Sequence, residues 1–197
     1  MKKTLLGIIG IALLIAVWFG LTYNGLVTKQ EQVESTWGNV QSSYQRRMDL
    51  IPNLVSTVKG YAKHEKSTFL EVTKARAQAY NASNKISNSS PTSQQQLNQL
   101  VSSQAALSGA VSKLLVVSER YPNLKASENF LKLQDQLEGT ENRINYARDQ
   151  FNNSVKTYNA SIRRFPGNIV ANIAGGFASK PYFQADKQAS SAPKVTF

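Results

Sequence analysis

The chain has no cysteine and only one histidine, and these two scarcities limit the chemistry that it can perform. Without cysteine there is no disulfide, no thiol nucleophile, no thiolate ligand for a metal and no attachment point for a cysteine-linked lipid. The one histidine, His64, precedes Glu65, but no second histidine lies four residues further on, so the helical zinc-protease motif is excluded. The sequence also contains neither a nucleophile motif nor a glycine-rich phosphate loop. We therefore expect no enzymatic activity, no cofactor and no metal site.

Charge is also absent from one long stretch near the N-terminus. Residues 4–28 carry none, and residues 5–21 are almost wholly apolar. At about 1.5 Å of rise per residue, roughly 20 apolar residues in a helix match the ~30 Å of bilayer hydrocarbon. The sequence therefore predicts a transmembrane helix over residues 4–26, after a basic start at residues 1–3.

A cleaved signal peptide is the alternative, because it shares the basic start and the apolar core. The exit of the apolar run, from Val17 to Tyr23, has no small-x-small cleavage site. Trp18 and Tyr23 are typical of side chains at a membrane interface, which favours a retained anchor.

The charges on either side of the apolar run predict its orientation. Lys2, Lys3 and the amino group precede it, whereas Lys29 is offset by Glu31 and Glu34 after it. Because the more basic flank stays in the cytoplasm, we expect a cytoplasmic N-terminus with the rest of the chain outside.

Beyond the anchor, apolar and aromatic residues recur at steps of three and four, which is the spacing of one face of a helix. The four stripes comprise Val33, Trp37, Val40, Tyr44, Met48 and Ile51; Leu54, Val58, Tyr61, Phe69, Val72 and Ala79; Leu97, Leu100, Leu107, Val111, Leu114 and Tyr121; and Phe130, Leu133, Leu137, Ile144, Phe151, Val155, Tyr158, Ile162 and Phe165. No alternating strand pattern stands out and the chain has only six prolines, so the sequence predicts an all-α fold. Because a lone amphipathic helix cannot hide its stripe from water, we expect residues 27–166 to form an antiparallel, up-down four-helix bundle of long helices.

The break between the first two stripes has two interpretations. In the first, Asp49 caps a second helix and Pro52 lies in its first turn, where the missing N–H costs little, so residues 46–48 form a tight turn. In the second, Pro52 kinks one continuous helix. The sequence leaves both interpretations open.

The later breaks are marked by polar residues and proline. Residues 81–96 are almost entirely polar and are predicted to form a loop that cannot bury itself, with Thr92 or Ser93 capping the third helix. The remaining predicted boundaries are a break at residues 119–124, a cap at Ser127 and a helix end at residues 165–168.

At the ends of the bundle, side chains from neighbouring turns are predicted to meet. An up-down arrangement brings the first and third turns together at the end far from the membrane. The candidates for salt bridges and contacts there are Arg46, Arg47, Asp49, Pro52, Glu119, Arg120, Tyr121 and Pro122.

The same arrangement returns the fourth helix to the membrane. Arg163 and Arg164 are then expected near the lipid head groups, and apolar residues in the tail that follows, residues 167–197, are expected to rest on the bilayer. An ordinary basic tail is the alternative. The candidate membrane-proximal residues are Trp18, Tyr23, Arg163, Arg164 and Phe177.

The chain carries a positive surplus. Of its 23 basic residues, 21 lie beyond Lys2 and Lys3, against 12 acidic ones, which leaves about nine net positive charges outside the anchor. Phospholipid head groups are the nearest anionic partners, unless the surplus serves solubility alone. The basic residues are scattered and no nucleic-acid motif is present, so no nucleic-acid partner is expected.

Residues 45–65 form the longest segment of the chain that resembles a known protein family. Residues 45–55 read Gln-Arg-Arg-Met-Asp-Leu-Ile-Pro-Asn-Leu-Val, and they continue in the same pattern to residue 65. Together with Trp37 and residues 23–24, 119–126, 146–148, 151–152, 165–166 and 193–197, this segment closely resembles the bacterial LemA family. The resemblance implies a single-pass membrane protein that carries an antiparallel helical bundle and has no assigned catalytic activity.

We therefore expect a non-enzymatic scaffold or interaction module in the bacterial inner membrane. Anchoring confines many copies to two dimensions and raises their effective concentration, so even weak contacts between copies would assemble them. The expected partners are the lipid bilayer, further copies of the chain and other envelope proteins. Binding of anionic lipid head groups or another polyanion through the basic surface is the alternative function.

Overall fold

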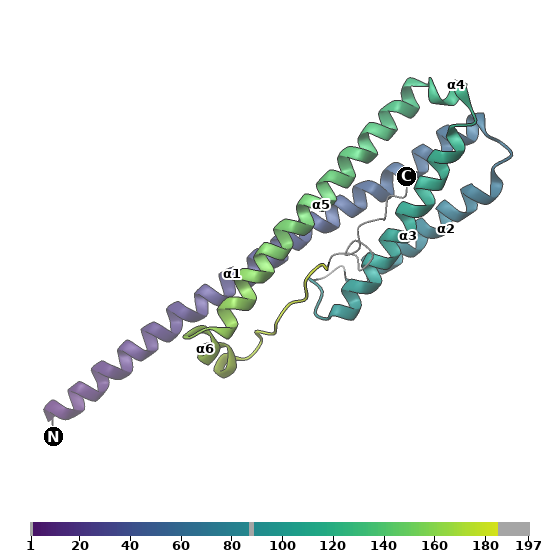
Figure 1. The fold of residues 1–197 in the computed structure, drawn as a ribbon. Helices are drawn as coiled ribbons and strands as arrows, with labels where there is room; N and C mark the ends of the chain where they lie inside the picture. Colours follow the sequence, from purple (N-terminus) through teal and green to yellow (C-terminus); the bar gives the residue numbers. More distant parts are fainter. Residues whose placement is uncertain (1, 87–88, 185–197) are drawn as a thin grey trace, which may run out of the picture.

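The computed structural model describes residues 2–86 and 89–184 of the chain. Within these residues it contains six helices and no strand: α1 (Lys2–Tyr61), α2 (Lys66–Asn84), α3 (Gln94–Ser118), α4 (Pro122–Lys125), α5 (Glu128–Arg163) and α6 (Gly167–Ala174) (Figure 1). The all-α prediction is confirmed.

The N-terminal part of α1 projects beyond the other helices (Figure 1). Its large apolar side chains between Leu5 and Leu21 are exposed except Phe19, which is half-buried against the core, and the first deeply buried residue is Leu26. This part is long and apolar enough to cross a membrane, as the sequence predicts. By length and composition α3 also qualifies, but a stripe of α3 from Leu97 to Leu114 is buried in the bundle. The apolar part of α1 is therefore the candidate membrane span.

Beyond the candidate span, the four long helices α1, α2, α3 and α5 pack as two antiparallel pairs (Figure 1). Helix α5 runs back along α1, and α3 runs back along α2. The short α4 joins α3 to α5 at the end far from the apolar part of α1, and α6 lies where α5 returns to that part (Figure 1). The α1 and α5 pair extends closer to the candidate span than the α2 and α3 pair does.

The core has a proximal cluster, near the candidate span, and a distal cluster. The proximal cluster is built around Trp37, Phe151 and Tyr158, and the distal cluster around Leu114 and Phe130. Each large side chain withdrawn from water contributes roughly 1.5–3 kcal/mol of stability. Most members of the four predicted stripes are buried, but Tyr61 and Phe165 are exposed because they lie at helix ends.

Of the two interpretations of the break near Pro52, the tight turn at residues 46–48 is wrong, and the continuous helix is right, because α1 continues through Pro52 to Tyr61. The buried residues Met48, Ile51, Leu54 and Val58 extend a single stripe along α1, and their burial offsets the roughly 3 kcal/mol that a proline costs inside a helix. A proline at position 52 leaves the carbonyl of Met48 without its helical donor. Arg76 of α2 supplies one instead, since its Nε donates to that carbonyl at 2.8 Å.

The polar loop is shorter and more buried than its composition predicts. Helix α2 extends to Asn84, and the side chains of Ile86 and Ser90 are buried against the bundle. The side-chain amide of Gln41 on α1 donates to the carbonyl of Ile86 at 3.0 Å. The prediction that this segment cannot bury itself is therefore wrong at Ile86 and Ser90, and also at Pro91, which is buried as well. At its end, the Ser93 cap is confirmed, because the Ser93 hydroxyl accepts from the backbone N–H of Gln96 at 3.3 Å.

The segment after α5 contributes to the core. Val170 and Ala171 of α6 are buried, and so is Phe183 further along the chain. Residues 177–184, which we call the strap, have no helix or strand and run back along the bundle towards its distal end (Figure 1). The last part of the predicted tail, residues 185–197, lies outside the described residues.

Candidate functional site

Arg47 lies at a buried polar junction of three helices. Its side chain extends from α1 between the two core clusters, and the residue is only 3% exposed. Nη1 donates to the two carboxylate oxygens of Glu141 on α5, at 2.9 and 3.0 Å, and to the hydroxyl of Ser108 on α3 at 2.8 Å. Nη2 donates to the side-chain oxygen of Gln104, also on α3. The junction therefore ties α1 to both α3 and α5.

The guanidinium of Arg47 also makes a cation–π contact with Tyr44. Its guanidinium carbon lies 5.5 Å from the centre of the Tyr44 ring. Burial raises the pKa of Tyr44, although the positive charges of Arg148 and Arg47 act in the opposite direction. The Tyr44 hydroxyl therefore stays neutral at physiological pH. Since the hydrogen bonds of Arg47 join three helices, we interpret this junction as a structural contact that holds α1, α3 and α5 together.

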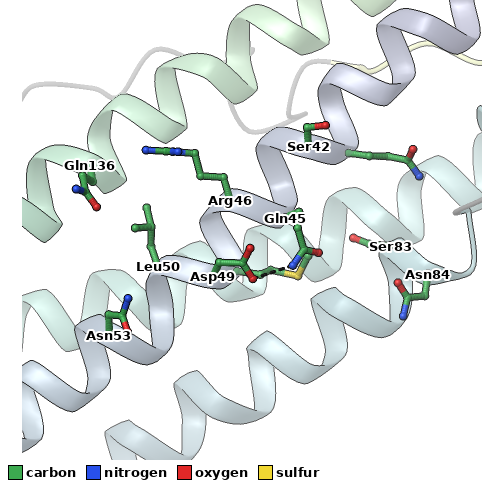
Figure 2. Close-up of a pocket in the computed structure, with 11 residues that line it drawn as sticks. Ser42, Gln45, Arg46, Asp49, Leu50, Asn53, Ser83, Asn84 and Gln136 are labelled. Atoms are coloured by element: carbon green, nitrogen blue, oxygen red, sulfur yellow. Dashed lines mark hydrogen bonds between the residues drawn. The ribbon is translucent and has the colours of Figure 1, made fainter.

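Arg46 and Asp49 line a shallow hollow on the outer side of α1. The hollow has a volume of about 730 Å³ and is also bordered by Ser83 of α2 and Gln136 of α5 (Figure 2). Figure 2 shows Arg46 extending towards α5 and away from Asp49. The Asp49 carboxylate accepts a hydrogen bond from the side-chain amide of Gln45 at 2.8 Å. Asp49 is thus a surface residue within a helix, and the cap predicted for it is wrong.

The distal end of the bundle is held by a different set of charges. Arg120 Nη2 donates to Glu65 Oε1 at 2.8 Å, and the hydroxyl of Tyr121 donates to the same oxygen at 3.2 Å. The ammonium of Lys125 pairs with Glu119. Pro122 opens α4, where its missing N–H costs little. These contacts tie the turn after α1 to the turn after α3.

The predicted meeting of Arg46, Arg47 and Asp49 with Glu119 and Arg120 is therefore wrong. Because α1 continues to Tyr61, Arg46 lies fifteen residues, or roughly 22 Å, before the distal end. The distal turn instead presents Glu65, whose carboxylate accepts the hydrogen bonds from Arg120 and Tyr121.

The predicted membrane-proximal residues gather where α5 and α6 meet α1. The rings of Trp18 and Phe165 lie 6.0 Å apart, and the rings of Tyr23 and Phe177 lie 5.6 Å apart in an edge-to-face arrangement. Arg163 Nε donates to the carbonyl of Asn159 at 3.1 Å. Aromatic rings with one apolar side and one wet side are typical of a membrane interface. This end of the molecule is where the apolar part of α1 meets the bundle.

A hollow of about 780 Å³ lies beside these rings, between α1 and α5. Its lining includes Lys29, Lys156 and Arg164, together with the hydroxyls of Thr22 and Ser161, and no acidic side chain. We call it the basic hollow. Lys156 and Arg164 are exposed and Lys29 is half-buried.

Glu34 forms a second junction, which the sequence analysis did not single out. Its carboxylate accepts hydrogen bonds from the backbone N–H and the hydroxyl of Ser90, and it pairs with Lys180 Nζ at 3.0 Å. Burial by itself would raise the pKa of Glu34, but the hydrogen bonds from Ser90 and the charge of Lys180 outweigh burial and lower it. Burial and the neighbouring Glu34 both raise the pKa of Tyr158. Glu34 thus joins the loop and the strap to α1.

The partners of Glu34 lie 56 and 146 residues away along the chain, so no local pattern signals the contact. Asn152 and Asn159 of α5, which hold the strap, were also missed as a pair. The available signal was their seven-residue spacing, which places both on one face of a helix. Among residues 2–86 and 89–184, no group of three or more His, Cys, Asp or Glu side chains is placed to hold a metal ion.

Comparisons with known proteins identify relatives of this chain. The magnetosome protein MamQ of Magnetospirillum gryphiswaldense is 27% identical over 191 residues, which cover 89% of this chain and 69% of that protein. Protein MamQ 2 of Paramagnetospirillum magneticum has the same identity and coverage. Protein LemA of Metamycoplasma hominis is 25% identical over 148 residues, covering 75% of this chain and 63% of that protein. Residues 36–197 match the LemA family as a whole, so this membrane-associated helical chain belongs to the LemA family.

Proposed function

We propose that the chain is a non-enzymatic scaffold of the bacterial inner membrane, with its N-terminus in the cytoplasm and its helical domain outside. The anchor and the first helix of the domain are one uninterrupted helix, α1. No flexible linker therefore separates the domain from the bilayer. The helix continues for 35 residues beyond Leu26, which at 1.5 Å per residue carries the distal end about 50 Å from the membrane.

The observation that carries this proposal is the chemistry of the distal end. Four large apolar side chains are exposed there, one from each long helix. They are Tyr61 in the last turn of α1, Leu70 near the start of α2, Val116 near the end of α3 and Leu131 in the first turn of α5. Leu70 and Val116 are 71% and 69% exposed. Large apolar side chains exposed at the end of a bundle are typical of a contact surface for another protein.

Holding such a surface at a fixed height favours contacts between neighbouring anchored molecules. All copies in one bilayer share an orientation, so their distal ends lie at the same distance from the membrane. Confinement to two dimensions raises the effective concentration of neighbours, and small apolar contacts then suffice for assembly. The partners of the distal surface are further copies of this chain or other envelope proteins.

The test is cross-linking in intact membranes with a lysine-reactive reagent. A chain carrying Leu70→Ser and Val116→Ser should give at least fivefold less cross-linked assembly than the unsubstituted chain. The matched control is Tyr146→Ser, which also removes an exposed apolar side chain but lies in the middle of α5. Equal cross-linking in the double variant and the control, with unchanged helix content, would show that the distal surface makes no contact.

A second candidate function is supported by the basic hollow. Lys29, Lys156 and Arg164 surround it beside the interfacial rings, so an anionic lipid head group fits its charge and position. Each basic residue near an anionic bilayer contributes about 1 kcal/mol of attraction. Anionic phospholipid in nanodiscs should therefore raise the unfolding temperature of the chain relative to zwitterionic lipid.

Replacing Lys29, Lys156 and Arg164 together by Gln should remove that rise. The matched control replaces three exposed lysines of the distal half, Lys59, Lys74 and Lys132, and changes the net charge equally. An equal loss in both triple variants would mean that the effect depends on overall charge and that the basic hollow is not a lipid site.

A further inference from the structure

The strap is held by a ladder of side-chain amides on α5. The side chain of Asn152 donates from Nδ2 to the backbone carbonyl of Phe183 at 3.0 Å and accepts at Oδ1 from the N–H of the same residue at 2.9 Å. Asn159 makes the same pair of bonds with the carbonyl and the N–H of Lys180, both at 2.9 Å. Each asparagine therefore satisfies both backbone groups of one strap residue.

The two spacings in this ladder match. Asn152 and Asn159 are seven residues apart, which is two helical turns or about 10.5 Å along α5. Lys180 and Phe183 are three residues apart, which is about 10 Å in an extended chain. The helix thus presents two amides at the repeat of an extended peptide, and it binds the peptide through backbone groups that any sequence carries.

Side-chain contacts add selectivity to this backbone recognition. The Phe183 ring lies 6.3 Å from that of Trp37 and 5.6 Å from that of Phe151, and the guanidinium carbon of Arg148 lies 4.6 Å from the centre of the Phe183 ring. Lys180 pairs with Glu34 on α1. The groove between α1, α3 and α5 therefore selects an aromatic residue with a cationic residue three positions before it.

The strap is joined to the rest of the fold by a hinge of two glycines. Gly175 and Gly176 have φ angles of 71° and 79°, in the left-handed region that favours glycine. No atom lies near the position that a Cβ would take at either residue. The described contacts of the strap are made with side chains and rings of the helices, so it can leave the groove without breaking a helical hydrogen bond.

We propose that this groove is an extended-peptide binding site and that its second occupant is the strap of another copy of the chain. Every copy carries the same aromatic and cationic residues at the same spacing, so a neighbour's strap satisfies the groove as its own does. The membrane anchor and the unbroken α1 set the strap and the groove of every copy at the same heights above the bilayer, so a neighbour's strap lies at the height of the groove. This inference rests on the proposed scaffold function and names the contact through which copies join.

The absence of native cysteine makes the exchange measurable. Gln184 of the strap and Asn98 of α3 line the same hollow, of about 680 Å³, and neither holds the ladder. Two differently tagged full-length chains, one with Gln184→Cys and one with Asn98→Cys, are co-expressed, and membranes are treated with a short bismaleimide. A single chain with both substitutions reports the strap in its own groove.

The expected result is a cross-link between the two tagged chains. It should fall at least fivefold when the Asn98→Cys chain also carries Asn152→Ala and Asn159→Ala, because these remove the ladder from the accepting groove. It should fall equally when Asn98→Cys is replaced by Gln99→Cys, an exposed position next to it on α3 that does not line the hollow.

Two results would overturn the inference. One is a cross-link between chains that is no stronger than with the Gln99→Cys chain, while the doubly substituted single chain cross-links fully. The other is no cross-link in the doubly substituted chain, which would place the strap outside the groove. Neither result contradicts the proposed contact role of the distal surface, because lysine cross-linking of the chain with Leu70→Ser and Val116→Ser tests that role separately.

Discussion

The carbonyl of Met48 connects the proline in α1 to the arginine of a neighbouring helix, and this connection makes a quantitative prediction. Pro52 cannot donate to the Met48 carbonyl, and Arg76 does so at 2.8 Å. Replacing Arg76 by Met keeps most of the side-chain stem but removes the donor. The carbonyl then loses a charged partner, which typically lowers the free energy of unfolding by about 1.5–3 kcal/mol.

The second substitution in the cycle is Pro52→Ala, which restores a backbone N–H at the position that normally donates to Met48. In that background the Met48 carbonyl no longer depends on Arg76, so Arg76→Met should cost less than about 1 kcal/mol. The two substitutions should therefore be coupled by about 1–2 kcal/mol. Chemical unfolding of the four full-length proteins in detergent, followed by helical circular dichroism, measures this coupling.

The control is Lys74→Met, which removes an exposed cation from the same helix two residues earlier. It should change the free energy of unfolding by less than about 0.5 kcal/mol in either background. If Arg76→Met costs the same with Pro52 as with Ala at that position, the hydrogen bond to Met48 does not compensate for the proline, and the reasoning fails.

Three further predictions use the same unfolding assay. Arg47→Ala should lower the free energy of unfolding by about 3 kcal/mol, because it leaves Glu141 and Gln104 without their buried cationic partner. Arg46→Ala, at the exposed neighbouring position, should change the free energy of unfolding by less than about 0.5 kcal/mol. Equal effects of the two substitutions would show that the Arg47 junction does not stabilise the fold. The pKa of Glu34 is lowered in the folded state, so the stability that Glu34 contributes is complete above its ordinary pKa of 4.5 and is lost as the pH falls through the lower folded pKa. The Glu34→Gln protein should therefore lose less stability than the unsubstituted protein when the pH falls below 4.5. Equal losses of stability in the two proteins would contradict this role of Glu34. Gly167→Ala should destabilise the protein strongly, because the added Cβ would overlap the backbone carbonyl oxygen of Ser161 at the end of α5. The control Gly139→Ala, whose added Cβ meets no atom, should be neutral or stabilising by up to about 1 kcal/mol. A neutral Gly167→Ala would show that α6 does not pack this closely against α5.

Features that depend on local sequence were predicted well. The uncharged run of residues 4–28 indicates the apolar helix, and the three-and-four spacing of apolar residues identifies most of the buried core. Thr92 or Ser93 was expected to cap the third helix because hydroxyl side chains satisfy free N–H groups at helix starts, and in the structure Ser93 makes this bond. These signals act within one or two helical turns, so a single sequence contains them.

Features that depend on distant partners could not be predicted from the chain alone. Pro52 lies inside α1 because the stripe on either side of it is buried and because Arg76, 24 residues later, completes the hydrogen bonding of the helix. Glu141, which pairs with Arg47, lies 94 residues from it. The hydrogen bonds of Asn152 and Asn159 could not be predicted, because their partners in the strap come near α5 only in the folded chain. Polar composition also misled at Ile86 and Ser90, since side chains of α1 supply the partners that water would otherwise provide.

An unbroken α1 also makes the domain a mechanical lever. A membrane-spanning helix adjusts its tilt when the thickness of the surrounding bilayer changes. With no joint between the span and the domain, such a tilt swings the distal surface sideways, and with an arm of about 50 Å a rotation of about 10° moves it by roughly 9 Å. A change of lipid composition that alters bilayer thickness is therefore expected to move the distal surface.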